Sequence, residues 1–250
     1  MSLPLLSIII PAHNEQNRLP RSLEQVFAFL EQQAYEAEVL VVENGSSDRT
    51  LEVAQGFAAS HANLHVIHEE GRGKGLAVRR GMLEARGRFR FMCDADLSMP
   101  IEEVNKFLPP NLPRFDVAIG SREIRGAVRY DEPFYRHSGG RLINLLIRLL
   151  ILPKLQDTQC GFKCFRDEAA EDLFRRQRLD GWSFDIEVLY LAERGGAKIV
   201  EVPIHWYYRT ESKVNALRDA FRMISDIFLI RANMRHGLYD ANRSQPELRA

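Results

Sequence analysis

The sequence predicts a single α/β domain in which helices cover both faces of a mostly parallel sheet. In the first 120 residues, short apolar runs alternate with segments whose apolar residues recur about every 3.6 positions, as in strand–helix units. Polar clusters follow several of these runs, at the strand ends where parallel sheets bind ligands. The chain has 250 residues, 45% of them hydrophobic, so it can bury the core that such a domain needs.

The alternation gives the elements in order. Five apolar runs are predicted as strands: Leu5–Ile10, Glu38–Val42, Leu64–Ile67, Arg88–Cys93 and Asp116–Ile119. Three segments between them are predicted as helices: Pro20–Gln33, Asp48–Ser60 and Leu76–Ala85. Because helical crossovers join parallel strands, the polar residues after these strands should meet at one edge of the sheet.

The second half of the chain is more helical. Gly139–Leu152 holds nine Leu or Ile residues, which is too short to span a bilayer and too apolar for a free surface helix. It is predicted as a core helix, a subunit contact or a membrane-interface helix. Val214–Arg235 is predicted as a longer amphipathic helix. The expected organisation is therefore a domain over 1–212 with a candidate interface helix at 139–152, an amphipathic helix within 213–238, and a flexible tail over 239–250.

Charge and cysteine content narrow the partners and the compartment. Lys plus Arg equals Asp plus Glu at 34 each, so no overall charge favours nucleic acid. The segment from Arg122 to Lys154 is locally basic, which suits an anionic ligand, a membrane surface or simply a solvated face. Three cysteines fit a reducing compartment. Because no signal peptide and no spanning helix are apparent, we expect a cytoplasmic protein that binds the cytoplasmic face of the membrane peripherally. A homo-oligomer is possible.

Asp94 and Asp96 are the first candidate site residues. They follow the apolar run that ends at Cys93, and side chains two apart on an extended segment point the same way. Two carboxylates so placed could hold one hard cation, Mg²⁺ or Mn²⁺, whose remaining positions take phosphate oxygens. The alternative is a solvated acidic turn in which one of the two caps a helix.

Several strings together resemble the type A glycosyltransferases of family 2, over about residues 5–215. The general family strings are Ile8–Glu15, Val42–Thr50, Gly73–Gly75 and Asp94–Asp96. A closer set resembles the dolichyl- or polyprenyl-phosphate glucosyl- and mannosyltransferases: Gly120–Arg122, Asp157–Lys163 and Trp182–Glu187. The string Asp157–Lys163 is the most specific and leans toward the glucosyl branch. The family's paired aspartates after the second strand are Glu43 and Asn44 here.

The resemblance implies a type A nucleotide-sugar transferase fold and a role for each matching residue. Asp94 and Asp96 would hold the metal with the diphosphate, and Arg122 and Asp157 join them as the implied catalytic residues. Arg122 and Arg136, with Ser121, would bind the acceptor. The implied donor pocket consists of Pro11, Asn14, Glu15, Glu43, Lys74, Asp94, Ala95, Asp96 and Gln159. Structural alternatives remain: a salt bridge for Arg122, a loop cap for Asp157, and core packing for Trp182 and Phe184.

The expected reaction is inverting transfer of a hexose, with UDP-glucose favoured, from a nucleotide sugar to a polyprenyl or dolichyl phosphate at the membrane surface. A lipid monophosphate has a second pKa near ~6, so it is already an oxygen nucleophile at neutral pH and needs no protein base. The alternatives are transfer from GDP-mannose, transfer to a soluble sugar hydroxyl with Asp157 or Asp185 as base, and a non-catalytic nucleotide-sugar binding module. A nucleotidyltransferase ranks low because no N-terminal glycine-rich, arginine-containing loop is present.

Overall fold

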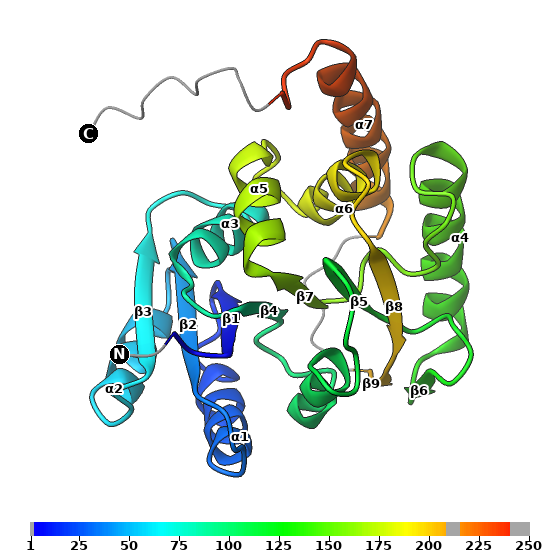
Figure 1. The fold of residues 1–250 in the computed structure, drawn as a ribbon. Coiled ribbons are helices and arrows are strands. Elements are labelled where there is room, and N and C mark those ends of the chain that lie inside the picture. The colour runs from blue at the N-terminus through cyan, green and yellow to red at the C-terminus, as the bar shows by residue number, and fades with distance from the viewer. Residues whose placement is uncertain (1–2, 209–215, 241–250) are drawn as a thin grey trace.

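The fold was analysed in a computed structural model that describes residues 3–208 and 216–240, leaving aside the side chains of 134–140, 142 and 216–220. A seven-stranded sheet runs through the molecule, and a two-stranded sheet lies beside it (Figure 1). The strands are β1 Leu6–Ala12, β2 Ala37–Asn44, β3 Leu64–Glu69, β4 Phe89–Cys93, β5 Val117–Ser121, β6 Val128–Tyr130, β7 Phe162–Arg166, β8 Ile199–Pro203 and β9 His205–Tyr207. The helices are α1 Leu19–Leu30, α2 Thr50–Ala58, α3 Lys74–Glu84, the 3₁₀ helix η1 Ile101–Phe107, α4 Phe134–Leu150, α5 Asp167–Arg176, α6 Phe184–Arg194 and α7 Ala216–Arg235.

The central sheet has the strand order β3-β2-β1-β4-β7-β5-β8. β1 pairs in parallel with β2 and with β4, and β5 pairs in parallel with β8. Its strands are apolar on both sides because both faces are covered: Ile8 and Ile10 of β1 enter one core cluster and Ile9 enters the other. The predicted α/β class, the five predicted strands and the three helices between them are confirmed.

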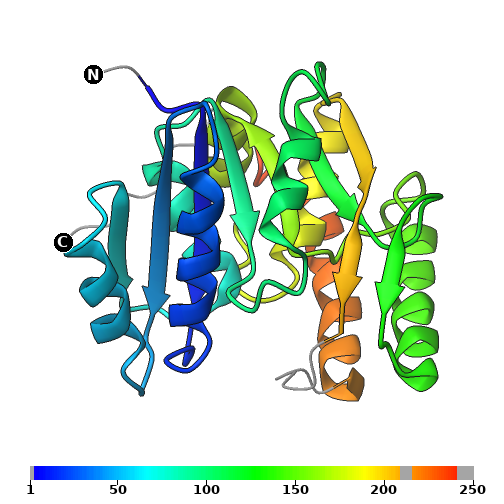
Figure 2. The same ribbon diagram turned by 90° about the horizontal axis from the view of Figure 1, so that it is seen from below.

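Helices cover the two faces of the sheet separately. α1, α2 and η1 lie on one face, and α3, α5 and α6 on the other (Figures 1 and 2). Each face therefore has its own hydrophobic core, with the sheet between them. This arrangement leaves the carboxyl ends of the parallel strands open at one edge, where loops can build a site.

Strand β7 runs opposite to its neighbours and was not predicted from the sequence. It is antiparallel to both β4 and β5, with Cys93 paired to Phe162 and Ile119 paired to Lys163. Because β7 is reversed, its beginning lies at the edge where β4 and β5 end. The segment that enters β7, residues 157–161, is therefore brought to the same edge as Asp94 and Arg122.

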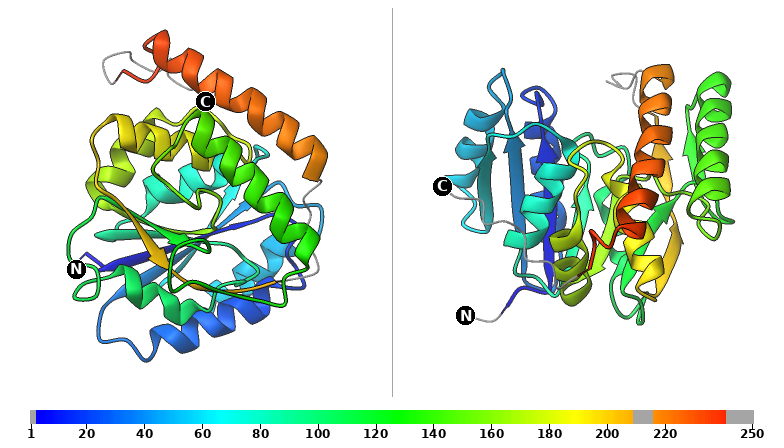
Figure 3. Two further views of the ribbon diagram at one scale, coloured as in Figure 1. Left: turned by 90° about the vertical axis from the view of Figure 1, so that its right-hand side faces the viewer. Right: turned by 90° about the horizontal axis from the view of Figure 1, so that it is seen from above.

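Helices α4 and α7 lie side by side on the outside of the molecule (Figure 3). α4 begins at Phe134, before the predicted start at Gly139, and the helix predicted from Val214 is described from Ala216. Ile147 faces the core, whereas Leu149 is 73% exposed, so the apolar residues of α4 divide between the protein and its surface. No helix in the described part of the chain is long and apolar enough to cross a bilayer. The proposed boundary at 212/213 and tail residues 241–250 lie outside the described residues.

Candidate functional site

A cavity of about 450 Å³ opens at the carboxyl edge of the sheet. Segments far apart in sequence form its walls: the loops after β1, β3 and β4, the end of β2, the start of α3, the end of β5, the segments before β7 and α6, and the chain around β9. The predicted site residues that line it are Pro11, Glu15, Lys74, Asp94, Ala95, Asp96, Arg122 and Gln159. Asn14, Glu43, Ser121 and Asp157 are not among the lining residues, and they support the wall from behind. The Arg136 side chain lies outside the described residues.

Asn14 joins the loops that follow β1 and β2. Its φ of 55° lies in the left-handed region, which Asn tolerates better than most residues. Its backbone N–H donates to the Ser46 hydroxyl at 3.0 Å, and its side-chain oxygen accepts from the Ser47 N–H at 2.8 Å. Glu15 beside it pairs with Arg18 at 2.6 Å, and both line the cavity. Asn14 therefore shapes the pocket mouth through the backbone.

Glu43 and Asn44 have different positions at the end of β2. The Glu43 carboxylate is buried and accepts hydrogen bonds from the Ser46 N–H and from His68 at 2.6 Å. Burial opposes its ionisation, but these bonds prevail and lower its pKa. Asn44 instead lines the cavity and donates to the carbonyl of Gly73 at 3.1 Å. Of this pair, Asn44 is placed to contact a ligand, whereas the family resemblance indicated Glu43.

Asp94 and Asp96 follow the end of β4, as predicted, and both line the cavity. They lie in a turn that the Leu97 N–H closes on the Asp94 carbonyl at 3.2 Å, and not on the extended segment that the prediction assumed. Asp96 accepts a hydrogen bond from the Ser98 N–H at 2.9 Å, and Asp94 pairs with the Lys74 ammonium at 2.5 Å. Burial and the neighbouring charge of Asp94 raise the pKa of Asp96. The pair thus carries unfavourable negative charge that a cation in the cavity would relieve.

The donor set fits a hard divalent cation bound together with a phosphate ligand. Within the described residues, no cluster of three or more His, Cys, Asp or Glu side chains could hold a metal. Two carboxylates with open positions are the arrangement in which Mg²⁺ keeps waters or substrate phosphates as its other ligands. Asp94 and Asp96 are the residues that would hold it.

Gly161 allows Asp94 to approach the segment before β7. A Cβ built at residue 161 would overlap the Asp94 carboxylate, so no larger residue fits while that side chain keeps its position. The same segment is anchored by Lys163, which is buried, donates to the Cys160 carbonyl and pairs with Asp185 of α6 at 2.7 Å. The predicted string 157–163 is thus a packed link between β4, β5 and α6.

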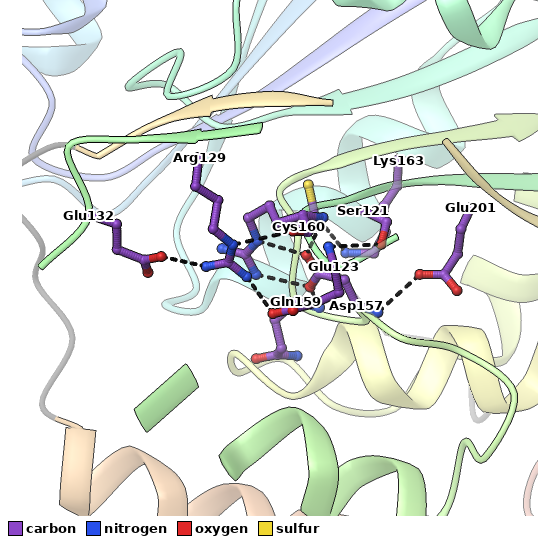
Figure 4. Close-up of polar contacts among 10 residues, drawn as sticks. Ser121, Glu123, Arg129, Glu132, Asp157, Gln159, Cys160, Lys163 and Glu201 are labelled. Carbon is purple, nitrogen blue, oxygen red and sulfur yellow. Dashed lines mark hydrogen bonds and ion pairs between the residues drawn. The ribbon is translucent and has the colours of Figure 1, made fainter. Parts of the chain in front are cut away.

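Arg122 and Asp157 form a buried ion pair, in which Asp157 lies behind the cavity lining (Figure 4) and Arg122 lines the cavity. The Asp157 carboxylate, 0% exposed, accepts from the Arg122 N–H at 3.0 Å, from Nε at 2.7 Å and from Nη2 at 2.9 Å, and also from the Gln159 N–H at 3.2 Å. Burial opposes the charge on Asp157, but the charge and hydrogen bonds of Arg122 prevail and lower its pKa. Arg122 donates to Asp157 through its Nε and Nη2 atoms. Its third guanidinium nitrogen, Nη1, makes neither of these bonds and can donate to a ligand.

A second layer of charged residues surrounds this pair. Arg129 pairs with Glu123 and Glu132 and donates to the Arg122 carbonyl, while the Asp157 N–H donates to Glu201 at 3.0 Å (Figure 4). The Ser121 hydroxyl is buried and accepts from the Glu123 N–H at 3.4 Å. The Arg122 side chain is therefore held in one orientation. The salt bridge weighed for Arg122 is present, and the same side chain also lines the cavity.

Aromatic rings complete the walls. Trp182 is 53% exposed and its ring centroid lies 5.1 Å from the Lys74 ammonium, whereas Phe184 is buried in the core. Trp206 lies 5.6 Å from the Arg122 guanidinium, and Tyr208 also lines the cavity. The sequence analysis missed Trp206 and Tyr208. Their spacing of two is the available signal, because residues two apart on an extended segment share a side.

Comparison with known proteins gives one consistent relationship. Residues 7–174 match the sequence model of the family described as "Glycosyl transferase family 2". The dolichyl-phosphate beta-glucosyltransferase of Drosophila melanogaster is 37% identical over 240 residues, covering 90% of this chain and 74% of that protein. The proteins of the same name from Homo sapiens and Saccharomyces cerevisiae are 31% and 30% identical, covering 74% and 77% of their lengths and 90% and 95% of this chain.

Solved structures share the fold at low sequence identity. Glucosyl-3-phosphoglycerate synthase from Mycobacterium tuberculosis, in complex with Mn²⁺ and uridine-diphosphate-glucose, aligns with a TM-score of 0.64. The alignment covers 91% of this chain and 79% of that chain at 17% identity. At this identity the likeness shows the fold alone.

Proposed function

Because the chain belongs to glycosyl transferase family 2 and is a glycosyltransferase, we propose that it transfers glucose from UDP-glucose to a polyprenyl or dolichyl phosphate. Its relatives from fly, human and yeast carry the name dolichyl-phosphate beta-glucosyltransferase. The observation that carries the proposal is that an acidic pair and an arginine fixed by a buried carboxylate line one cavity. One wall suits a cation with a diphosphate, and the other suits a phosphate monoester.

The donor wall is proposed to bind the nucleotide diphosphate. Asp94 and Asp96 would hold Mg²⁺ or Mn²⁺, which when bound neutralises charge on the leaving diphosphate. The Lys74 ammonium lies beside them and can add a second positive charge. Pro11, Glu15 and Asn44 line the same wall and would contact the nucleoside end.

The acceptor wall explains why a phosphate suits this site better than a sugar hydroxyl. A hydroxyl acceptor needs a general base within hydrogen-bond reach. Asp157 cannot be that base in this arrangement, because it has no exposed surface and its oxygens accept four N–H groups. Its lowered pKa also makes it a poor proton acceptor. A lipid monophosphate arrives already ionised, so positioning by Arg122 is sufficient.

The reaction then needs one displacement. The lipid phosphate oxygen would attack the anomeric carbon from the side of Arg122 while the bond to the diphosphate breaks on the side of Asp94 and Asp96. Attack and departure on opposite sides of the carbon invert its configuration. Arg122 contributes by binding the phosphate through a guanidinium whose orientation Asp157 has already fixed.

The lipid acceptor requires the site to meet a membrane, and the outer surface of α4 and α7 is proposed to do this. Exposed apolar side chains gather on these two helices: Leu145 and Leu149 on α4, and Phe221, Phe228 and Leu229 on α7. Exposed Arg141 and Arg148 on α4 add positive charge that anionic lipids attract. β6 leads into α4 and pairs with β9, which carries Trp206. A lipid held at α4 would therefore be close to the acceptor wall.

Three free, buried cysteines suit the reducing, cytoplasmic side of the membrane.

The proposal is tested with a donor and acceptor screen. Purified protein, Mn²⁺ and dolichyl phosphate are incubated with radiolabelled UDP-glucose, GDP-mannose and other nucleotide sugars, and label extracted into organic solvent is counted. We expect extraction from UDP-glucose above all other donors. If the extracted label comes from GDP-mannose instead, the transferred sugar is mannose and the proposal of glucose is wrong. If label is found only on soluble sugars, the proposal of a lipid acceptor is wrong.

A further inference from the structure

Lys74 lies next to Asp94 in the cavity. Its ammonium lies 2.5 Å from an Asp94 carboxylate oxygen and 5.1 Å from the centre of the Trp182 ring. Asp96 and Asp185 also attract it. The ammonium therefore supplies part of the positive charge that the acidic pair requires.

The backbone of Lys74 is fixed while its side chain is long. Gly73 before it has a φ of 143°, and a Cβ there would overlap the carbonyl of Asp180. The Leu76 N–H donates to that same carbonyl at 3.2 Å. The first turn of α3 is thus held against the loop that precedes α6. The flexible four-carbon stem of lysine lets the ammonium move several ångströms from this fixed point.

Two cations cannot share Asp94 without repulsion, since unit charges a few ångströms apart interact strongly even at a partly shielded site. We propose that Lys74 is a placeholder for the divalent cation: its ammonium neutralises Asp94 in the nucleotide-free protein and moves to the donor diphosphate when the cation enters with the nucleotide. The inference rests on the cation site of the proposed function. A placeholder lysine makes cation binding weak without nucleotide and strong with it. The charges in the site are then balanced only when the cation and the nucleotide sugar are bound together.

A permanent structural ion pair is the alternative, and it predicts the opposite result. If Lys74 only held Asp94 in position, removing the ammonium would loosen the carboxylate and weaken cation binding. If Lys74 is a placeholder, removing it frees the carboxylate and strengthens cation binding in the absence of nucleotide. The sign of the change separates the two roles.

The experiment measures Mn²⁺ binding by the paramagnetic resonance signal of the free ion, with no sugar or acceptor present. For Lys74→Met without nucleotide we expect Mn²⁺ affinity to rise about tenfold or more over wild type, because one repelling charge is gone. With saturating Mn²⁺, UDP affinity should fall about tenfold, because the diphosphate loses an ammonium partner. Lys74→Gln is measured in parallel, and thermal unfolding confirms that each variant is folded.

Arg72→Met is the matched control, since Arg72 lines the same cavity two residues before Lys74. Its loss should change nucleotide-free Mn²⁺ affinity much less than the loss of Lys74. Unchanged or weaker Mn²⁺ binding in both folded Lys74 variants would overturn the placeholder role while leaving the cation site in place. If wild type binds no Mn²⁺ with either UDP or GDP, the cation site itself is wrong, and the placeholder role fails with it. Neither result depends on which sugar or acceptor the enzyme uses.

Discussion

Asp157 shows how burial decides what a carboxylate can do. With no surface exposed and four N–H donors around it, it stays ionised and directs Arg122. The pair is expected to be costly to break, because removing one partner leaves the other charge buried, typically at about 3–5 kcal/mol. Its contribution is therefore visible in stability as well as in turnover.

The lowered pKa of Asp157 predicts a specific pH dependence. Its folded-state pKa lies below the unfolded value of about 3.9, so the ionised pair stabilises the fold above that pH. This stabilisation is lost as the pH falls through the folded-state value. Asp157→Asn should lower the free energy of unfolding at pH 7, and the deficit relative to wild type should shrink below about pH 4. Urea denaturation at pH 7 and pH 3 measures it, and a deficit that is the same at both would contradict the assignment.

Arg122→Lys tests the geometry rather than the charge. Lysine keeps the positive charge, but its compact ammonium lacks the planar fork that gives Asp157 two parallel bonds and fixes the direction of the remaining N–H groups. We expect transfer to dolichyl phosphate to fall by about tenfold or more, while the affinity for UDP changes little. Steady-state kinetics with each substrate varied separately decide this. A defect confined to the KM of the donor would place Arg122 at the other end of the reaction.

The strands differ in how well local sequence predicts them. β1, β2, β4 and β5 are mostly buried, and β3 is a partly buried edge strand; the predicted ranges of all five agree with the structure within a few residues. β7 was missed because its five residues include Lys163 and Arg166, and because strand direction depends on distant partners rather than on local pattern. The pairing of Arg122 with Asp157 was missed for the same reason. Both residues were identified singly, but 35 positions separate them.

Gly161, directly before the reversed strand β7, lies against the Asp94 carboxylate. This contact predicts the effect of a larger residue at position 161. Gly161→Ala places a methyl group where the Asp94 carboxylate lies, so that side chain must move. We expect Mn²⁺ affinity in the presence of UDP to fall about tenfold or more, because a displaced ligand no longer meets the ion at the required distance. Gly56→Ala on α2 is the control, since a Cβ there meets nothing within 4 Å. Equal Mn²⁺ binding in both variants would show that Asp94 is not held by this contact.

The paired helices α4 and α7 concern the molecule as a whole, because they set how it meets its surroundings. Sequence periodicity predicted both helices, but it could not say which apolar residues stay exposed. The answer depends on their position beside each other and against α6. Leu149 and Phe221 are 73% and 75% exposed, so the outer surface keeps large apolar side chains in water.

We expect the protein to float with anionic liposomes at low salt, since apolar insertion and basic residues act together. Leu149→Asp combined with Phe221→Asp should abolish flotation and reduce transfer to long-chain dolichyl phosphate, while UDP binding stays at the wild-type value. Leu3→Asp is the matched control, because Leu3 is 74% exposed near the N-terminus, away from these helices. Flotation of the double variant at the wild-type level would contradict the assignment of this surface.

The reversal at β7 also determines how this architecture can diversify. The proposed donor wall comes from β1, β2, β4 and α3 with the loops beside them, and the proposed acceptor wall, with Arg122 and Trp206, comes from the end of β5 and from β9. Since the two walls come from different stretches of backbone, substitutions that reshape one need not disturb the other. We therefore expect that substitutions can reshape the proposed acceptor wall while the proposed donor wall keeps its form. Gly161 marks the limit of this separation, because there the segment before β7 comes directly against the Asp94 carboxylate.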